Sequence, residues 1–262
     1  MSDFDTIGFL SSGLDRLVDD IRSAYPDLYS LTMKVNAFCQ RLQYDLEFRS
    51  NDANQVIAAT LFARAVTTYQ AFIILSTRGM PHQASMILRC LIECVFLLVA
   101  ISKNPDYSRK IAGSDQHDYR RSRKNLKQFL ERHNPDHKDI GTIQDQIKAN
   151  SQKIDEHKCK PLGIRLIARD AGLEDWYDTV YCSLSEPIHS SIRSLEELLK
   201  FNNNQKITCL ENHPDTKDIG ILFLVGSYIM LFAIEGISAI LNKDTSSFTD
   251  NLRKSLPKFR SP

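Results

Sequence analysis

Two charged residues interrupt the most apolar stretch of the chain. Arg89 and Glu93 lie in the run MILRCLIECVFLLV, which spans residues 86–99. Side chains four residues apart share one face of a helix, so the guanidinium and the carboxylate can pair. A charge pair among apolar side chains is costly to desolvate and needs further partners. Two interpretations stay open: an ion pair that also binds a neighbouring helix, or a charged wall of a pocket.

A second polar set could supply those partners. Four residues recur at a spacing of four: Tyr177, Tyr181, Ser185 and His189. On a helix they form one stripe beside an apolar stripe, so they border the core. Pro187 either kinks this helix or follows a new helix start with Ser185 as N-cap. The polar side chains then either satisfy one another at a helix interface or face a site.

Together the two sets would form a buried cluster that serves as a hydrolytic site. In this hypothesis His189 is the general acid or base and Arg89 stabilises developing negative charge. Glu93 or Tyr181 would orient these groups, and Ser185 would complete the cluster. RNA or a nucleotide would be the substrate. The alternative is a non-enzymatic sensing or interaction module, in which the cluster is a structural polar network or holds a small anion.

A basic stretch offers a separate binding surface. Residues 109–138 hold nine Lys or Arg against four Asp or Glu. Its candidate nucleic-acid contacts are Arg120, Arg121, Arg123, Lys124 and Lys127. Such residues either form a solvated surface or contact phosphates. Tyr119 and Phe129 alone accompany them, which does not indicate base stacking. Residues 1–30 and 170–197 are acidic and could pair with this stretch within the fold or between subunits.

Composition narrows the protein class. The chain has 33 basic and 32 acidic residues, so no global charge marks a nucleic-acid or membrane protein. Its six cysteines form no C-x-x-C pair, and the N-terminus has no secretory signal. We therefore expect reduced thiols and a cytoplasmic location. No zinc-site spacing and no Gly-rich phosphate loop is present, so we expect no metal and no cofactor.

Helical periodicity dominates the chain and predicts an all-α multi-helix bundle. The two most apolar helices, 81–102 and 216–241, are expected at its centre. A break at Gly79-Met80-Pro81 separates the first of them from the preceding helix. Residues 107–132 read as a surface helix, 140–154 as a short helix or loop, and 174–199 as a long helix. No window alternates at period two, so we expect no strands.

The membrane question rests on residues 219–234, which are uncharged. A spanning helix needs about 20 apolar residues, and this run holds Gly220, Gly226 and Ser227. We therefore expect a buried central helix and no membrane span.

Three regions are predicted. Residues 1–50 would form an N-terminal helical hairpin or arm, 51–245 the main bundle, and 246–262 a loose C-terminal tail. The N-terminal region could pack on the bundle or serve in dimerisation, and we expect a homodimer.

A helix-Gly-turn-helix segment with R-x-x-x-E, followed by Y-x-x-x-S-x-x-x-H, resembles DUF5677, a family of bacterial helical proteins of unknown function. The matching residues are Gly79, Arg89, Glu93, Tyr181, Ser185 and His189. The resemblance covers roughly residues 51–241. It implies an all-helical intracellular domain without an established activity, and it suggests a toxin or defence role.

A looser likeness connects the chain with the HEPN group of helical nucleotide-binding and RNase domains. That group uses an R-x(4–6)-H motif, whose spacing Arg132 and His137 match. Pro135 falls inside the motif here, where the helix is expected to end.

Overall fold

The computed structural model describes residues 3–185, 195–196, 198–203, 205–210 and 213–256. Within these residues the protein is a helical bundle, which confirms the predicted all-α multi-helix class.

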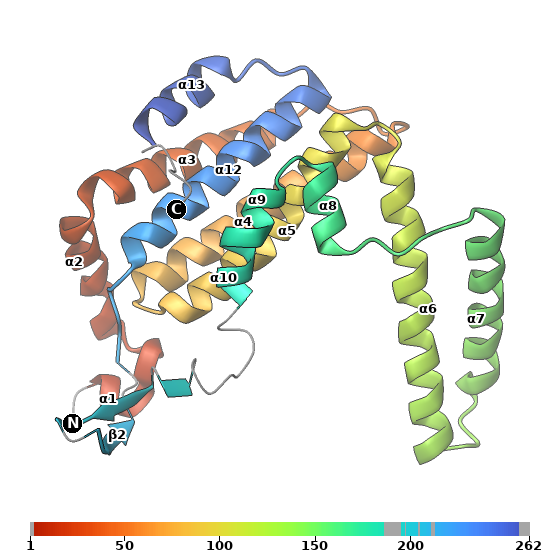
Figure 1. The fold of residues 1–262 in the computed structure, drawn as a ribbon, viewed down its shortest axis with the longest axis horizontal. Coiled ribbons are helices and arrows are strands. Elements are labelled where there is room, and N and C mark those ends of the chain that lie inside the picture. The colour runs from red at the N-terminus through yellow and green to blue at the C-terminus, as the bar shows by residue number, and fades with distance from the viewer. Residues whose placement is uncertain (1–2, 186–194, 197, 204, 211–212, 257–262) are drawn as a thin grey trace.

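Three long helices form the centre of the bundle. They are α4 (Ala53–Thr77), α5 (Pro81–Lys103) and α12 (Ile219–Leu241), and each packs against the other two (Figure 1). Helix α3 (Pro26–Tyr44) lies across α12 and α4. The two expected central helices are therefore present, and α4 joins them.

The start of α4 and its junction with α5 both follow from the local sequence. The Asp52 carboxylate caps α4 by accepting from the amides of Asn54 and Gln55 at 3.1 and 3.3 Å. Gly79 ends α4 in the left-handed region at φ 70°, and Pro81 opens α5. A Cβ at Gly79 would lie 2.8 Å from the Cβ of Pro214, so the turn also needs glycine for space.

Close packing explains the glycines of the apolar α12. A Cβ at Gly226 would come within 2.9 Å of the Phe72 ring and 3.1 Å of the Tyr69 ring. Beside it, the Ser227 hydroxyl lies 3.3 Å from the buried Tyr69 hydroxyl. The polar interruptions of this helix therefore face its neighbours within the bundle.

Among the described residues, three helices are long and apolar enough to span a membrane, judged by length and composition alone: α4, α5 and α12, with mean hydropathies of 1.4, 2.3 and 2.0. Only α12 was considered as a possible span from the sequence. In the bundle 72% of the apolar window of α12 is buried, and 56% of that of α5. The absence of a membrane span stays a prediction.

Of the N-terminal elements, α2 (Leu17–Ala24) and α3 join the same core. The elements before them bury no residue: α1 (Asp3–Ile7), η1 (Gly8–Leu10) and η2 (Ser12–Arg16). Ile21 and Val35 are fully buried in the core of the bundle. Arg78 at the end of α4 binds the Asp15 carboxylate at 2.9 Å and the Ser11 carbonyl oxygen at 3.0 Å.

Two helices form an arm that projects from the bundle (Figure 1). They are α6 (Tyr107–His133) and α7 (Asp139–Glu156), which pack against each other along the arm. The prediction of a short helix or loop at 140–154 is wrong. The apolar residues of α7 are sparse because only the face toward α6 is covered. Ile143, Ile147 and Ile154 are buried on that face. Between them, the Asn150 amide donates to Gln116 Oε1 at 2.6 Å.

The helix predicted at 174–199 is confirmed in part. Residues 174–185 are helical, as α9 (Glu174–Trp176), the π-turn η3 (Tyr177–Tyr181) and α10 (Cys182–Ser185), and α8 (Ile164–Asp170) precedes them. Residues 186–194 lie outside the described part of the chain. The predicted end is wrong, because Leu199 already belongs to a strand.

Two short strands form an antiparallel hairpin, which contradicts the expectation of no strands. They are β1 (Leu199–Phe201) and β2 (Ile207–Leu210). The Asn202 side chain accepts from the Lys206 amide at 3.0 Å and shapes the turn. The strands are too short for an alternating pattern to be recognised, and β2 is exposed on both faces.

The C-terminal region is helical where it is described. Helix α13 (Ser246–Ser255) packs on α12, and Leu252 is buried. The expectation of a loose tail is therefore wrong for these residues. Their apolar positions are few because α13 covers the outside of α12 and α3 (Figure 1).

Candidate functional site

Four of the five predicted catalytic residues meet where η3 and α10 cross α5. Arg89 Nε donates to Ser185 Oγ at 3.0 Å, and Arg89 Nη2 donates to the Tyr181 hydroxyl at 2.6 Å. The same nitrogen lies 3.3 Å from Glu93 Oε1. The spacing of four in both helical segments therefore produces one cluster, with the charges on α5 and the hydroxyls opposite.

Tyr181 connects the two charges of the pair. Its hydroxyl accepts from Arg89 and donates to Glu93 Oε1 at 2.9 Å. Burial, and after it the Glu93 carboxylate, raise the pKa of Tyr181 from 10.0 to about 12, while Arg89 opposes the shift. At neutral pH the phenol is protonated and donates a hydrogen bond, so it is a poor base.

The Arg89–Glu93 pair is less secluded than expected. The Arg89 side chain is 26% exposed and that of Glu93 is 36% exposed. The next residue on α5, Cys90, is exposed, so this face of the helix borders solvent beyond the cover of η3 and α10. The prediction of a buried pair is therefore wrong, although the pair does bind a neighbouring helix.

An aromatic stack extends the cluster along η3. The rings of Tyr177 and Tyr181 are 4.9 Å apart at 18°, and the Arg165 guanidinium lies 5.8 Å from the Tyr177 ring. Arg165 also pairs with Glu174 at 3.4 Å and with Asp178 at 3.3 Å. Arg165 was not predicted from the sequence. The available signal was the spacing of four between Glu174 and Asp178, because two acids on one helix face need a cation nearby.

His189 cannot be placed. The predicted general acid or base lies in residues 186–194, outside the described part of the chain. The choice between a kink and a helix start at Pro187 lies there too. The network formed by Arg89, Glu93, Tyr181 and Ser185, called the α5 cluster below, is described without it.

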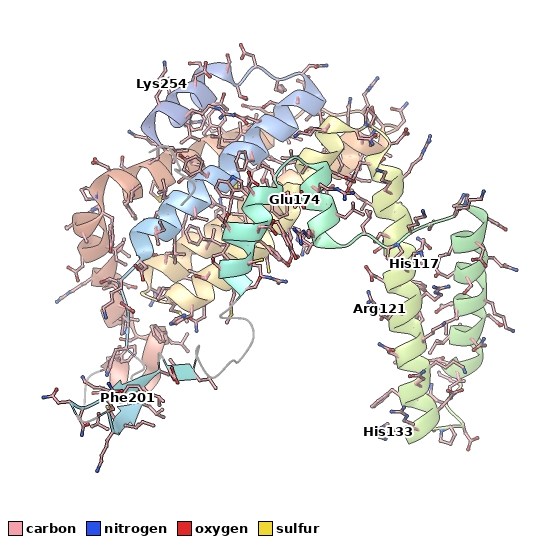
Figure 2. All side chains as sticks on the ribbon, in the orientation of Figure 1. His117, Arg121, His133, Glu174, Phe201 and Lys254 are labelled. Carbon is pink, nitrogen blue, oxygen red and sulfur yellow. The ribbon has the colours of Figure 1, made fainter. Side chains whose placement is uncertain are left out.

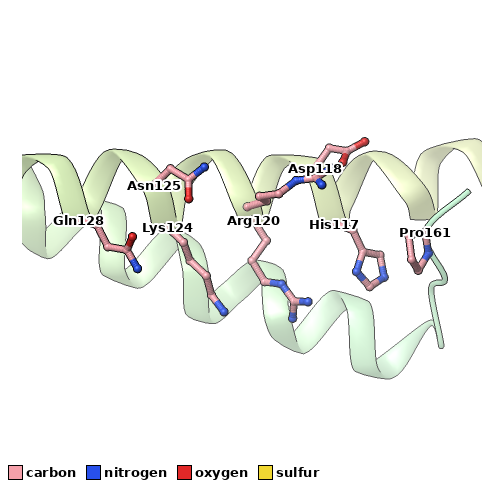
Figure 3. A pocket seen from close by; sticks show the side chains of 8 residues that line it. His117, Asp118, Arg120, Lys124, Asn125, Gln128 and Pro161 are labelled. Atoms are coloured by element: carbon pink, nitrogen blue, oxygen red, sulfur yellow. Dashed lines mark hydrogen bonds and ion pairs between the residues drawn. The ribbon is translucent and has the colours of Figure 1, made fainter. Parts of the chain in front are cut away.

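Most of the basic stretch belongs to α6 of the arm, and part of it lines a groove of about 410 Å³ (Figure 3). The lining residues are His117, Asp118, Arg120, Arg121, Lys124, Asn125, Gln128 and Pro161. Three of the five predicted nucleic-acid contacts are thus brought together. The other two are engaged elsewhere: Arg123 lies 5.0 Å from the Tyr119 ring, and Lys127 pairs with Glu131 at 2.7 Å.

Two cations of this α6 groove have no carboxylate partner among the described residues. They are Arg120 and Lys124, whereas Arg121 pairs with Asp118. Both lie on α6, one helical turn apart, in the stretch between His117 and His133 that stands away from the bundle (Figure 2). A pair of uncompensated cations in a concave surface is suited to an anion.

The motif that resembled the HEPN group is split between two elements. Arg132 belongs to the last turn of α6, while His137 follows it in the loop and accepts from the Asp139 amide at 3.2 Å. Within the described ranges, no group of three or more His, Cys, Asp or Glu side chains could hold a metal ion.

A family model matches residues 55–207 of the chain, which is more than half of its length; its description is a family of unknown function, DUF5677. The chain belongs to the DUF5677 family. The DUF5677 match includes the α5 cluster and the whole arm, but α3 and α12, which complete the core, lie outside it. No curated protein and no solved structure matches the chain. The likeness to the HEPN group finds no support in these comparisons.

Proposed function

We propose that this DUF5677 protein is a non-enzymatic binding module that contacts the phosphates of RNA through the basic face of α6. The observation that carries the proposal is the groove with Arg120 and Lys124, two uncompensated cations on a projecting arm. Cations that neutralise phosphates release condensed counterions, so binding of this kind is favourable and independent of sequence.

The α5 cluster supports a structural role beside this surface. Glu93 balances the charge of Arg89, and each of the four side chains has a partner inside the cluster. A satisfied polar network at a helix crossing specifies how the two elements pack. In this protein it fastens η3 and α10 to α5.

The aromatic residues of α6 point to backbone contacts rather than base stacking. Tyr119 and Phe129 are exposed, but neither lines the α6 groove. The Tyr119 ring lies beside Arg123 and the Phe129 ring lies 4.6 Å from His133. Neither ring is therefore part of the groove surface on which a base could stack.

The test is RNA binding by the full chain, measured by fluorescence anisotropy with a single-stranded oligonucleotide at several salt concentrations. The double variant Arg120→Gln/Lys124→Gln should bind at least about tenfold more weakly, because two charge-assisted contacts are lost. Its slope of log K against log salt should fall by about 1.4, which corresponds to two phosphates of a single strand.

The matched control removes two cations from the other helix of the arm. Lys148→Gln/Lys153→Gln changes the net charge equally but lies on α7, away from the α6 groove. We expect it to change affinity less than about threefold. Wild-type protein that fails to bind RNA, or a control as weak as the groove variant, would overturn the proposal.

A hydrolase or RNase-like effector is the second candidate function, and one observation favours it. The structure brings Arg89, Glu93, Tyr181 and Ser185 together, and the stripe continues to His189 in the sequence. In this case expression would arrest growth and His189→Ala would relieve the arrest. Arrest that persists undiminished in the variant would count against His189 as the acid or base.

A further inference from the structure

The α6 groove ends at a wall formed by the chain itself. The segment from residue 157 to 163, which leaves α7, crosses α6 at one end of the groove (Figure 3). His117 Nε2 donates to the Cys159 carbonyl oxygen at 2.9 Å, and the Leu162 amide donates to Ser114 Oγ at 2.9 Å. These bonds hold the segment on both sides of Pro161, which lines the groove.

Tight packing under the crossing makes this wall firm. A Cβ at Gly113 would lie 3.0 Å from Cys159 Sγ, so the segment rests directly on the α6 backbone. Gly113 is itself buried. An extended molecule that runs along α6 toward the bundle therefore meets the crossing segment and cannot continue in the groove.

The polar groups are arranged in order from this wall. His117 lies beside Pro161, Arg120 and Lys124 follow on successive turns of α6, and Gln128 lies beyond them (Figure 3). Successive turns are about 5.4 Å apart along the axis. Because His117 already donates to Cys159, the free donors of the groove are those of Arg120, Lys124 and Gln128, in a row that begins one turn from the closed end.

We propose that the α6 groove binds the terminal phosphate of an RNA strand, with the phosphate at the His117 end and the strand leading away past Lys124. This inference rests on the proposed function and specifies its ligand. A phosphodiester within a strand continues on both sides, so the wall excludes it from the closed end. A terminal phosphomonoester continues on one side only.

Charge favours the same ligand. A phosphomonoester has a second pKa of about 6 and carries close to two negative charges at neutral pH, whereas a phosphodiester carries one. The uncompensated Arg120 and Lys124 provide two positive charges on the first two turns of α6 beyond the closed end. A hydroxyl end would leave these charges without their counterpart.

The test compares short single-stranded RNAs of one sequence that carry a 5′-phosphate, a 3′-phosphate or hydroxyls at both ends, with binding to the full chain followed by anisotropy. We expect one phosphorylated end to bind at least about tenfold more tightly than the hydroxyl form. Arg120→Gln/Lys124→Gln should remove this preference. Arg123→Gln, which lies outside the groove lining, should retain it.

The outcomes separate the two proposals. If all three RNAs bind equally and the groove variant weakens them equally, recognition of the end is wrong while RNA binding stands. If no RNA binds, both proposals fail. Competition by inorganic phosphate or a mononucleoside monophosphate distinguishes the source of the phosphate: displacement of the labelled RNA only at far higher concentration supports a strand end. Displacement at equal concentration shows a small-anion site and overturns the assignment.

Discussion

Arg89 is held by three groups at once, and its loss should therefore be measurable. Arg89→Ala removes the donors to Tyr181 and Ser185 and leaves Glu93 without its counter-charge. A fully buried pair would cost about 3–5 kcal/mol when one partner is removed. Because water reaches both side chains, we expect a smaller loss of about 1–2 kcal/mol in the free energy of unfolding, measured by urea denaturation.

An exposed pair on another helix is the control for this change. Arg22 and Asp19 pair at 2.6 Å, with side chains 59% and 67% exposed. Arg22→Ala should change stability by less than about 0.5 kcal/mol. Equal effects of the two substitutions would show that the α5 cluster contributes nothing beyond a surface contact.

Tyr181 makes the same cluster sensitive to alkaline pH. Its pKa is raised from 10.0 to about 12 because burial and Glu93 disfavour the phenolate. The folded state thus binds the phenolic proton more tightly than the unfolded state. The stabilisation is complete below pH 10 and is lost as the pH rises from 10 to 12.

The measurement compares wild type with Tyr181→Phe. The difference in unfolding free energy between the two proteins should shrink across pH 10–12. The phenolate absorbance of the wild type minus that of the variant gives the titration of Tyr181, and its midpoint should lie above pH 10. A difference curve with its midpoint near pH 10 would contradict a buried, hydrogen-bonded phenol.

At the scale of elements, two glycines should respond in opposite directions to the same substitution. Gly141 lies in the first turn of α7, where an added Cβ would meet no atom within 4 Å, whereas Gly79 has φ 70° and faces Pro214. Gly141→Ala should stabilise the protein by about 0.5 kcal/mol, and Gly79→Ala should destabilise it by more than about 1 kcal/mol. Thermal unfolding measures both. Shifts of the same sign would be inconsistent with these backbone assignments.

At the scale of the whole molecule, charge is distributed between separate parts. The acidic residues near the N-terminus and the basic arm lie at opposite ends (Figure 1), so they do not neutralise each other within one chain. Glu174 and Asp178 instead pair with Arg165, and Asp170 lies 3.8 Å from Lys110 at the base of the arm. On α6, Arg120 and Lys124 keep their charge for a ligand, whereas Arg121 and Lys127 pair with acids of the same helix.

The packing of the three apolar helices leads to a prediction for the intact protein. α5 and α12 bury most of their apolar windows in each other and in α4. Packing within the chain therefore already removes most of this apolar surface from water, which insertion into a membrane would otherwise do. We expect the expressed protein in the soluble fraction after lysis, and in the supernatant of an alkaline carbonate wash. Recovery in the washed membrane pellet would contradict this expectation.

Much of the architecture follows from local chemistry, since caps, breaks and the helical period depend on neighbouring residues. Asp52, Gly79 and Pro81 delimit helices as their types predict, and the spacing of Arg89 to Glu93 and of Tyr181 to Ser185 places each pair on one face. Elements whose pattern is short or one-sided were missed: α7, β1 and β2.

Long-range packing decides the features that local chemistry does not, because the periodicity of one segment carries no information about which segment packs against it. It sets the exposure of Arg89, the π-turn that stacks Tyr177 on Tyr181, and the recruitment of Arg165. It also forms the α6 groove, whose end wall is a crossing segment bound to His117 through Cys159, 42 residues further along the chain. Neighbouring residues define the helices and their polar faces, whereas contacts between distant segments define which of those faces can receive a ligand.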